Sequence, residues 1–360
     1  MSSSKPQPDE GISDAERSLL RKSVRDFLSA RWPAEKAVEQ SGSAAAIDML
    51  WRGMAGQGLA SLGSATADAG LREIVLVFEE LGRASCPAPL LGAVAANLAL
   101  AAQQSNTVRA FLEDLHQGKA MAAVAFGAFD GDAAAGRAAV RGDALSGKLS
   151  FVEGAQTATH FLVFTEAGVA LAAGGAPGLS IKATPGIAVP PFAEIAFENT
   201  PAVRLDVPTK TLVDIALVAR LACAGRALGA AQRAFDLAVD HAKVRKQFGQ
   251  LIGQFQAVQH KLANCLVSLD GARLTIATAA AARDSSNPDW RIFAASAIAF
   301  AGPALRDVSI QTHRALGAIG YAEEHEAPRH FRRVHADLAR FGGAPRARAE
   351  LADFVLGPIP

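Results

Sequence analysis

The residues best suited to bind a ligand form a compact block in the second half of the chain. Arg245 opens the sequence RKQFGQ, Phe248 lies three residues later, and Gln256 follows within FQAVQHKLA. Arginine presents a planar fork of donors that can grip two phosphate oxygens at once. Glutamine can both donate and accept hydrogen bonds. A long helical pattern breaks at the glycine of this block, so we expect Arg245 at a helix end, within reach of a phosphate-bearing ligand.

A second block with ligand-binding potential is LGAIGY, residues 316–321. Gly317 and Gly320 permit a backbone approach to a ligand that a side chain would block. Arg314 lies just before this turn and offers another guanidinium for a phosphate. Arg314, Gly317 and Ala318 are therefore candidate ligand contacts.

The N-terminal elements that must support these blocks are predicted to be helical over residues 1–118. Ser13 and Glu16 form a possible capping box at the start of a segment whose apolar residues recur at helical spacing. A second helical pattern runs through LREIVLVFEELGR, and a third follows the break at CPAPLL.

The pattern of apolar and turn-forming residues then changes at two further places along the chain. Residues 119–208 carry short apolar runs broken by Gly, Asp and Pro, including a predicted hairpin over residues 142–152. Residues 209–360 return to long helical patterns with short connections, which predict an antiparallel four-helix bundle. The expected fold class is therefore α+β, with an N-terminal helical domain, a central β-barrel-like domain and a C-terminal four-helix bundle.

Together the two blocks resemble the signatures of the acyl-CoA dehydrogenase family. Residues 245–263 are similar to its R-x-x-F-G … F-Q-x-x-Q-x-x-L-A signature, and residues 314–325 to its Q-x-x-G-G-x-G-[FY] turn and following E-H segment. The helix–β–helix layout is also similar, so the resemblance covers nearly the whole chain. It implies FAD as the cofactor and α,β-desaturation of an acyl-CoA thioester, in fatty acid or steroid side-chain degradation.

In this family, residues of these signatures contact a flavin that the neighbouring subunit holds. By resemblance, Arg245 would bind the pyrophosphate and Phe248 would pack on the adenine or ribose. Arg220 matches an arginine that lies near the acyl-CoA in the family. Because its sequence neighbours are apolar, Arg220 needs a partner, and the thioester end of the pocket is one candidate. The full implied cofactor-binding set is Arg245, Phe248, Gln256, Arg314, Gly317 and Ala318.

The catalytic carboxylate of the family is missing from both places where the resemblance puts it. One place falls on Phe341, within the sequence RFGG, and the other falls on Ala219, directly before Arg220. Neither side chain can remove a proton. No catalytic residue is assigned, although Glu324 or Asp337 could act as an unconventional base.

The β region also departs from the family, on the same side of the flavin as the missing carboxylate. Residues 124–132 keep little of the T-E-P-x-x-G-S-D loop that hydrogen-bonds the flavin. Phe151-Val152-Glu153 stands in place of the W-[IV]-[ST] tripeptide, and an ionised Glu153 only accepts hydrogen bonds where a hydroxyl would donate. The family residues that this chain retains are those that would reach across a subunit interface to a neighbour's flavin. We therefore expect a subunit that completes the FAD site of a homologous catalytic partner, in a heterodimer or heterotetramer that takes acyl-CoA as substrate.

Other functions stay open on the sequence alone. The chain could form a homo-oligomer, act as a non-catalytic structural or binding subunit, or be a related flavin oxidase or monooxygenase of the same fold. Arg245 could simply cap a helix C-terminus. Glu324 could start a helix, Glu153 could face solvent from a strand, and Arg332-Arg333 could be a surface or interface pair.

Three histidines invite a metal interpretation, but their spacing argues against it. His325, His330 and His335 recur every five residues, which rotates each by about 140° from the last on a helix. They would not share a face, so solvated or core histidines are the expected outcome.

Composition excludes several classes of partner. The net charge of +1 provides no electrostatic reason to expect nucleic acid or an anionic membrane, and no apolar run is long enough to predict a membrane span. The three cysteines are odd in number and widely spaced, which predicts neither a disulfide framework nor a zinc site; Cys223 and Cys265 are expected to be buried fillers. The N-terminus is polar and lacks an apolar signal segment, so the expected location is the cytoplasm.

Overall fold

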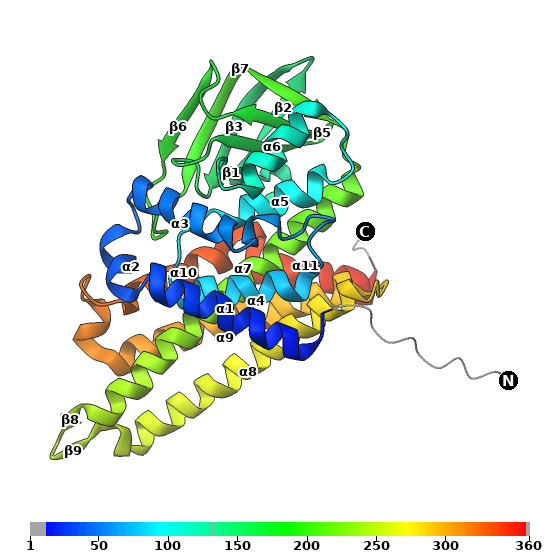
Figure 1. The fold of residues 1–360 in the computed structure, drawn as a ribbon. Helices are drawn as coiled ribbons and strands as arrows, with labels where there is room; N and C mark the ends of the chain where they lie inside the picture. The colour runs from blue at the N-terminus through cyan, green and yellow to red at the C-terminus, as the bar shows by residue number, and fades with distance from the viewer. Residues whose placement is uncertain (1–11, 132, 358–360) are drawn as a thin grey trace.

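The computed structural model describes residues 12–131 and 133–357, so the polar segment before residue 12 lies outside the described residues. A curled sheet forms one end of the molecule, short helices cross its middle, and long helices run to the opposite end (Figure 1). This arrangement confirms the predicted α+β class, with helices, a β region and helices in that order.

The N-terminal part is a layer of helices that lies between the sheet and the long helices (Figure 1). The predicted capping box is present, since Glu16 N donates to Ser13 Oγ at 3.3 Å and Ser13 N donates to Glu16 Oε2 at 2.8 Å. Arg17 joins this helix to α4 through Glu73, at 2.7 Å. The helices are α1 (Asp14–Arg31), α2 (Ala34–Gln40), α3 (Ala44–Gly56), α4 (Leu71–Arg83), α5 (Leu90–Leu100) and α6 (Asn106–His116).

The central part is a seven-stranded sheet in the order β1-β4-β5-β7-β3-β2, with β6 paired to β7. Strands β1 and β4 are parallel and the other pairs are antiparallel. The predicted hairpin is wrong in its extent, because residues 144–152 form one strand and the turn lies at Gly142-Asp143, before it. The strands are β1 (Ala122–Ala125), β2 (Gly136–Arg141), β3 (Ala144–Val152), β4 (His160–Thr165), β5 (Gly168–Ala173), β6 (Leu179–Ala183) and β7 (Ala193–Leu205).

The sheet curls because one long strand serves two sets of neighbours. One end of β7 pairs with β5, and the other end pairs with β3 and β6. The two halves enclose an apolar core of their own, in which Leu149, Phe161 and Ile195 are fully buried. This core lets the sheet stand as a rigid body against the helices.

The C-terminal part contains the four predicted long helices and one more. The additional helix packs on α9, and its opening sequence of Gly, Ala and Pro hid it from the sequence pattern. A short hairpin joins α7 to α8, and its strands, β8 (Lys246–Gln247) and β9 (Gln250–Leu251), have two residues each. The helices are α7 (Thr209–Val244), α8 (Gln256–Asp284), α9 (Trp290–Leu316), α10 (Ala327–Ala339) and α11 (Gly343–Leu356).

Helices α4 and α7 meet at nearly backbone contact, which glycine makes possible. A Cβ on Gly229 would lie 1.8 Å from the carbonyl oxygen of Glu79, and a Cβ on Gly82 would lie 1.8 Å from that of Arg226. The small residues along α7 therefore serve close helix packing. This crossing fixes α7, and with it Arg226, relative to the N-terminal helices.

Two helical stretches are apolar and long enough to cross a membrane by length and composition alone, namely α8 and Trp290–Tyr321. Both belong to the bundle, and 39% and 50% of their most apolar windows are buried within it. Core helices of globular proteins pass the same test, so this is weak support for a membrane span.

Candidate functional site

The structure brings the six predicted cofactor-binding residues to one end of the bundle. Arg245 is the C-terminal cap of α7, Gln256 begins α8, and Gly317 is the C-terminal cap of α9. A small apolar cluster that includes Leu237, Leu262 and Leu316 ties these three helices together there. We call the following six residues the bundle-end site: Arg245, Phe248, Gln256, Arg314, Gly317 and Ala318.

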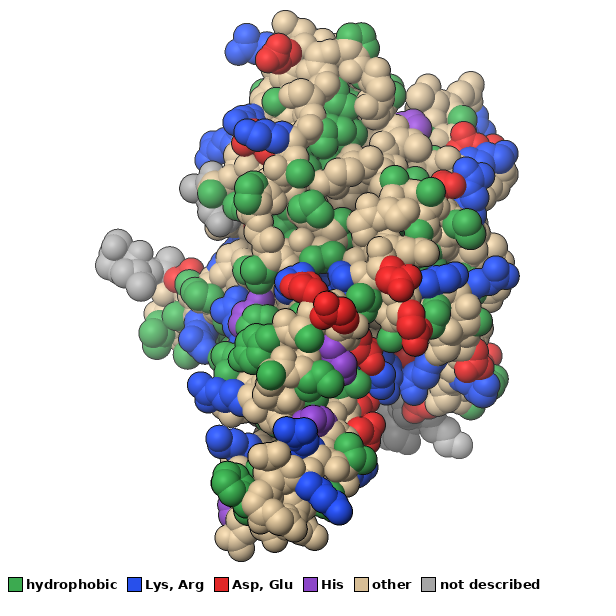
Figure 2. Space-filling view, turned by 90° about the vertical axis from the view of Figure 1, so that its left-hand side faces the viewer, with side chains coloured by type: hydrophobic (Ala, Val, Ile, Leu, Met, Phe, Trp, Pro, Cys, Tyr) green, Lys and Arg blue, Asp and Glu red, His purple; other side chains and the backbone are tan. Residues whose placement is uncertain are grey.

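All six residues of the bundle-end site are exposed. Phe248 is 93% exposed at the tip of the β8–β9 hairpin. Its φ of 51° and that of Gly249, 81°, close the turn. The carbonyl of Arg245 accepts a 2.8 Å hydrogen bond from Ile252 N, which fixes the base of the hairpin. Lys, Arg and His side chains gather on the lower part of this face, near the hairpin end (Figure 2). This surface suits an anionic ligand with a flat ring.

A second candidate region lies where the sheet meets the bundle. The structure joins the three segments in which the sequence departs from the family. Phe341 N donates to Asp130 Oδ1 at 2.9 Å, and Arg340 donates to Glu153 Oε2 at 2.7 Å. Asp130, Phe151 and Arg340 line one cleft of about 260 Å³ between the sheet and α10. The resemblance places the flavin ring in this cleft, which we call the sheet–bundle cleft.

Five charged residues fill the space beside this cleft, and we call them the ion cluster: Glu153, Arg226, Arg333, Asp337 and Arg340. Arg226 donates to Glu153 at 2.7 and 2.9 Å and to Asp337 at 2.7 and 2.9 Å. Arg333 approaches Glu153 at 3.6 Å and Asp337 at 3.7 Å. Three guanidinium groups and two carboxylates therefore share one buried site.

Two sequence expectations about the ion cluster were wrong. The side chain of Glu153 is only 12% exposed, so it does not face solvent from a strand. Arg333 is not a surface residue but is buried, and it also donates to the carbonyl of Val189 at 3.0 Å. Both errors have one cause: the burial of these charges depends on partners that lie far away in the sequence.

The ion cluster holds the Glu153 carboxylate in the charged form. Burial alone would raise the pKa of Glu153, but Arg226, Arg340 and Arg333 together hold it well below its ordinary value. Burial raises the pKa of the Cys223 thiol, which lies beside Arg226 and Arg340, to about 12. Cys223 is therefore a buried thiol, and Cys265 is also buried, as the sequence predicted.

The two positions onto which the resemblance places the family's base are apolar and buried. Phe341 is 1% exposed, and its ring packs edge-on against Phe126 at 5.0 Å between centroids. Ala219 is 2% exposed within α7. Asp337 was a candidate for an unconventional base, but its side chain is fully buried and bound to Arg226.

Glu324, the other candidate base, is exposed in the turn between the bundle-end site and α10. It does not start the helix either, because α10 begins at Ala327 after Glu326. Glu326 instead pairs with Arg233 and with His330, the latter at 3.2 Å.

The two regions differ in whether they fit a flavin dinucleotide. The bundle-end site offers two exposed guanidinium groups, an exposed aromatic ring and an open glycine turn, which fit the phosphates and adenosine. By resemblance, the segments around the sheet–bundle cleft lack the hydroxyl donor that the family directs at the ring. Where the family has a small hydroxyl donor, the carboxylate of Glu153 is engaged by three arginines. All three nitrogens of Arg226 are likewise engaged by carboxylates.

Arg220 lies in the wall of a separate cavity of about 300 Å³ between α7, α9 and α11. The cavity is mainly apolar, and Leu217, Ile292 and Leu351 contribute to its wall. Arg220 Nη1 donates to both oxygens of Glu350 at 2.9 Å. The partner that the sequence required for Arg220 is thus supplied by α11.

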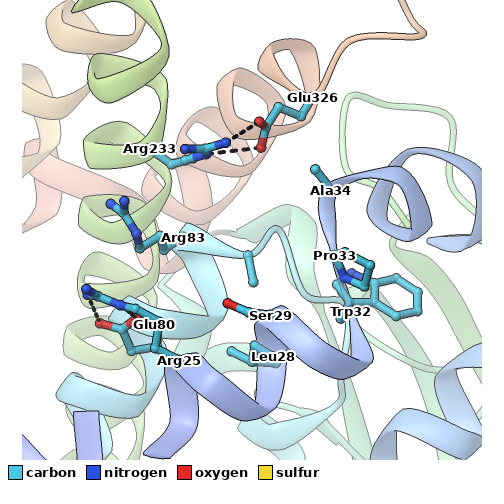
Figure 3. A pocket seen from close by; sticks show the side chains of 11 residues that line it. Arg25, Leu28, Ser29, Trp32, Pro33, Ala34, Glu80, Arg83, Arg233 and Glu326 are labelled. Carbon is cyan, nitrogen blue, oxygen red and sulfur yellow. Dashed lines mark hydrogen bonds and ion pairs between the residues drawn. The ribbon is translucent and has the colours of Figure 1, made fainter. Parts of the chain in front are cut away.

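Another cavity of about 300 Å³ lies between α1, α4, α7 and the start of α10 (Figure 3). Arg25 pairs with Glu80 and Arg233 pairs with Glu326 within it (Figure 3). It contains none of the residues that the sequence singled out as cofactor- or substrate-binding. Because Arg25, Arg83 and Arg233 are already paired, they leave this cavity no unpaired guanidinium for an anionic ligand.

The three histidines each contact a different partner. His330 contacts Glu326, His335 contacts Ser309 and His325 accepts from Ala327 N. Among the described residues, no group of three or more His, Cys, Asp and Glu side chains could hold a metal ion.

Comparisons with known proteins agree with these features. Residues 14–118 match the family description "Acyl-CoA dehydrogenase, N-terminal domain", and residues 213–345 match "Acyl-CoA dehydrogenase, C-terminal domain". The chain is 30% identical to "Acyl-CoA dehydrogenase IpdE2" of Mycolicibacterium smegmatis over 343 residues, which are 92% of this chain and 96% of the relative.

Two solved structures are similar over almost their full length. One is the "Tcur3481-Tcur3483 steroid ACAD G363A variant", with a TM-score of 0.83, 28% identity and coverage of 95% of this chain and 98% of that one. The other is the ChsE4-ChsE5 complex from Mycobacterium tuberculosis, with a TM-score of 0.81, 23% identity and coverage of 98% and 100%. The second likeness supports the fold.

Proposed function

Because this chain belongs to the acyl-CoA dehydrogenase family, we propose that it is one subunit of a heteromeric acyl-CoA dehydrogenase. In this proposal the chain supplies the bundle-end site to an FAD whose ring is held by a homologous partner. The partner carries the catalytic carboxylate and a complete ring site. The assembly belongs to the oxidoreductases, while this chain performs no proton abstraction of its own.

One observation carries the proposal, namely the contrast between the two halves of the family's FAD site. The bundle-end site is exposed, and its two guanidinium groups come from helices that end side by side. Beside the sheet–bundle cleft, Glu153 and Phe341 stand where the resemblance places the family's donor and its base. A chain that made homodimers would turn its bundle-end site toward a second cleft with the same losses. A heteromer provides a ring site for it to complete.

Within the partner's FAD site, each residue would have a definite task. FAD supplies the redox chemistry when it is bound to the partner. Arg245 and Arg314 would bind the pyrophosphate oxygens by charge-assisted hydrogen bonds. Phe248 would stack on the adenine, and Gln256 would donate and accept at its polar edge. The turn at Gly317, whose φ is 64°, would bring the backbone at Ala318 close to the phosphates.

We propose a steroid-derived acyl-CoA as the substrate class of the assembly. The support is the similarity to a protein described as a steroid acyl-CoA dehydrogenase. The cavity beside Arg220 would be the remnant of the acyl-CoA site in this chain. Its apolar wall suits hydrocarbon, and the buried Nε and Nη2 of Arg220, which have no hydrogen-bond partner among the described residues, would be available to the thioester end. We propose the cytoplasm as the location of the assembly.

The decisive experiment compares this chain alone with the chain co-expressed with a homologue that has an intact base. The purified samples would be measured for flavin absorbance, for flavin per subunit and for acyl-CoA dehydrogenation. We expect a colourless, inactive chain alone and a yellow, active complex. A yellow and active preparation of this chain alone would overturn the proposal.

Substitutions in the complex then test the bundle-end site itself. Phe248→Ala removes a side chain that touches little else in the chain, so the fold should be unchanged. Stacking of a base on an aromatic ring contributes about 1–3 kcal/mol, so the dissociation constant of FAD should rise by roughly 5- to 150-fold. Phe354→Ala, which removes a phenylalanine 62% exposed at the end of α11, is the matched control and should leave FAD affinity unchanged.

A further inference from the structure

The ion cluster spans the boundary between the sheet and the bundle. Glu153 follows directly after β3, Arg226 belongs to α7, and Asp337 belongs to α10. The residues that meet there are separated by 73 positions for Glu153 and Arg226 and by 111 for Arg226 and Asp337. The cluster therefore joins three parts of the chain that have no local connection.

The contacts within the ion cluster are short and nearly saturated. The side chain of Arg226 is 1% exposed and that of Asp337 is fully buried, and two hydrogen bonds of 2.7 and 2.9 Å join them. The same guanidinium makes two hydrogen bonds to Glu153, at 2.7 and 2.9 Å. Arg340 adds a further 2.7 Å contact to Glu153. A buried charge that is paired and hydrogen-bonded in this way is held in one place.

Aromatic rings close the same region against water. The guanidinium of Arg340 lies over the rings of Phe192, at 5.3 Å, and Phe341, at 4.9 Å. Phe192 belongs to the segment before β7, so Arg340 contacts the sheet through both a charge and a ring. Arg226 lies 5.7 Å from the ring of Phe78 in α4, which links the cluster to the N-terminal helices.

We propose that the ion cluster is a built-in clamp, which holds the sheet against the bundle in the place where the family holds the flavin ring. The clamp makes this chain independent of a flavin of its own for folding and for keeping the sheet in position. The identification of that place rests on the proposed function, but the clamping of the sheet by Glu153, Arg226 and Asp337 does not.

The test uses the full chain purified alone. Glu153→Gln keeps the size of the side chain but removes the charge that faces three arginines. Removing one member of a buried ion pair leaves the other uncompensated, so we expect the unfolding midpoint to fall by roughly 5 °C or more. Hydrogen exchange should rise at the end of β3 and in the segment before β7. Asp337→Asn, on the bundle side of Arg226, should produce a comparable loss.

A matched control and a milder variant keep the test decisive. Glu194→Gln removes an acid from β7 whose partner, Lys148, is exposed, and it should leave the midpoint unchanged. Arg333→Gln removes the longer contacts to the two carboxylates together with the 3.0 Å hydrogen bond to the carbonyl of Val189, and it should cause an intermediate loss. It gives a measurable result even if Glu153→Gln does not fold. Equal midpoints for Glu153→Gln and Glu194→Gln, or no loss in Arg333→Gln, would contradict the clamp.

Addition of FAD separates the clamp from the proposed function. A ligand that binds the native state raises the unfolding midpoint, so saturating FAD should leave that of the isolated wild-type chain unchanged. A rise would overturn the claim that the chain needs no flavin of its own. A complex without flavin would overturn the proposed function and leave the results for Glu153→Gln and Arg333→Gln standing as support for the clamp.

Discussion

At the scale of single residues, three phenylalanines in the segments compared with the family have a left-handed backbone conformation. Phe151, Phe248 and Phe341 have φ values of 61°, 51° and 58°. A left-handed conformation costs a residue other than glycine roughly 1–2 kcal/mol, so surrounding contacts must hold each of them. The hydrogen bond from Phe341 N to Asp130 is one such contact. The ring of Phe341 also packs against that of Phe126.

Buried histidines determine how the stability of this chain responds to acid. Burial lowers the pKa of His313 and of His330 below their ordinary value of 6.5, although Glu326 opposes the change at His330. Both rings are therefore neutral in the folded chain and bind a proton more readily when it unfolds. The stability they contribute is complete above about pH 6.5 and is lost as the pH falls toward their folded-state pKa values.

We expect the free energy of unfolding in urea to decrease between about pH 7.5 and about pH 5.5. His313→Gln removes one of the groups responsible and should make this decrease smaller. His260→Gln, at an exposed position on α8, should retain the full decrease. If His313→Gln shows the same pH dependence as the unchanged chain, His313 does not contribute in this way.

At the scale of elements, the contact between α4 and α7 sets the position of Arg226. Gly229 faces the carbonyl of Glu79 and Gly82 faces that of Arg226, each too close for a Cβ. Neither contact involves the flexible end of a side chain that could move aside. The two helices would have to separate to accept any larger residue.

Gly229→Ala should therefore destabilise the chain, although alanine favours helices. The extra methyl group overpacks a backbone contact, which costs about 1–3 kcal/mol or more, and urea unfolding measures this loss. Gly56→Ala, at a position in α3 where a Cβ would meet nothing within 4 Å, is the matched control and should be neutral or slightly stabilising. A neutral Gly229→Ala would mean that α4 and α7 can move apart freely.

At the scale of the whole molecule, α8 has one apolar side packed in the bundle and another that no part of the described chain covers. Leu274 is 69% exposed and Val267, two turns earlier, is 72% exposed. Phe293 and Phe300 of α9 are also partly exposed. Exposed apolar surfaces of this kind are typical of protein–protein contacts, and we propose that the partner subunit covers this one.

Leu274→Lys should leave the stability of the isolated chain unchanged but weaken its assembly with a partner. Burial of a leucine contributes about 1.5–3 kcal/mol, so the dissociation constant of the complex should rise by roughly 10-fold or more. Analytical ultracentrifugation of the co-expressed subunits measures this change. Met49→Lys, at a residue 70% exposed on α3, should leave assembly intact; normal assembly of Leu274→Lys would exclude this face from the interface.

The sequence alone determined the features that depend on local spacing. The RKQFG block placed Arg245 at the end of α7, the capping box at Ser13 was present, and the two base positions were apolar at Phe341 and Ala219. The order of helices, strands and helices also followed from the periods of apolar residues. These signals lie within a few turns of chain, where spacing alone fixes which side chains share a face.

Tertiary structure decided which charges are buried and what each one pairs with. Glu153 was expected in solvent and Arg333 at the surface, yet both lie in the ion cluster. Arg226 is central to that cluster, and nothing in its local sequence distinguishes it from the other arginines of α7. The physical reason is that a buried charge is stable only with its partner, and here the partners come from segments 73 and 111 residues away. Such pairings are fixed only when the sheet and the bundle meet.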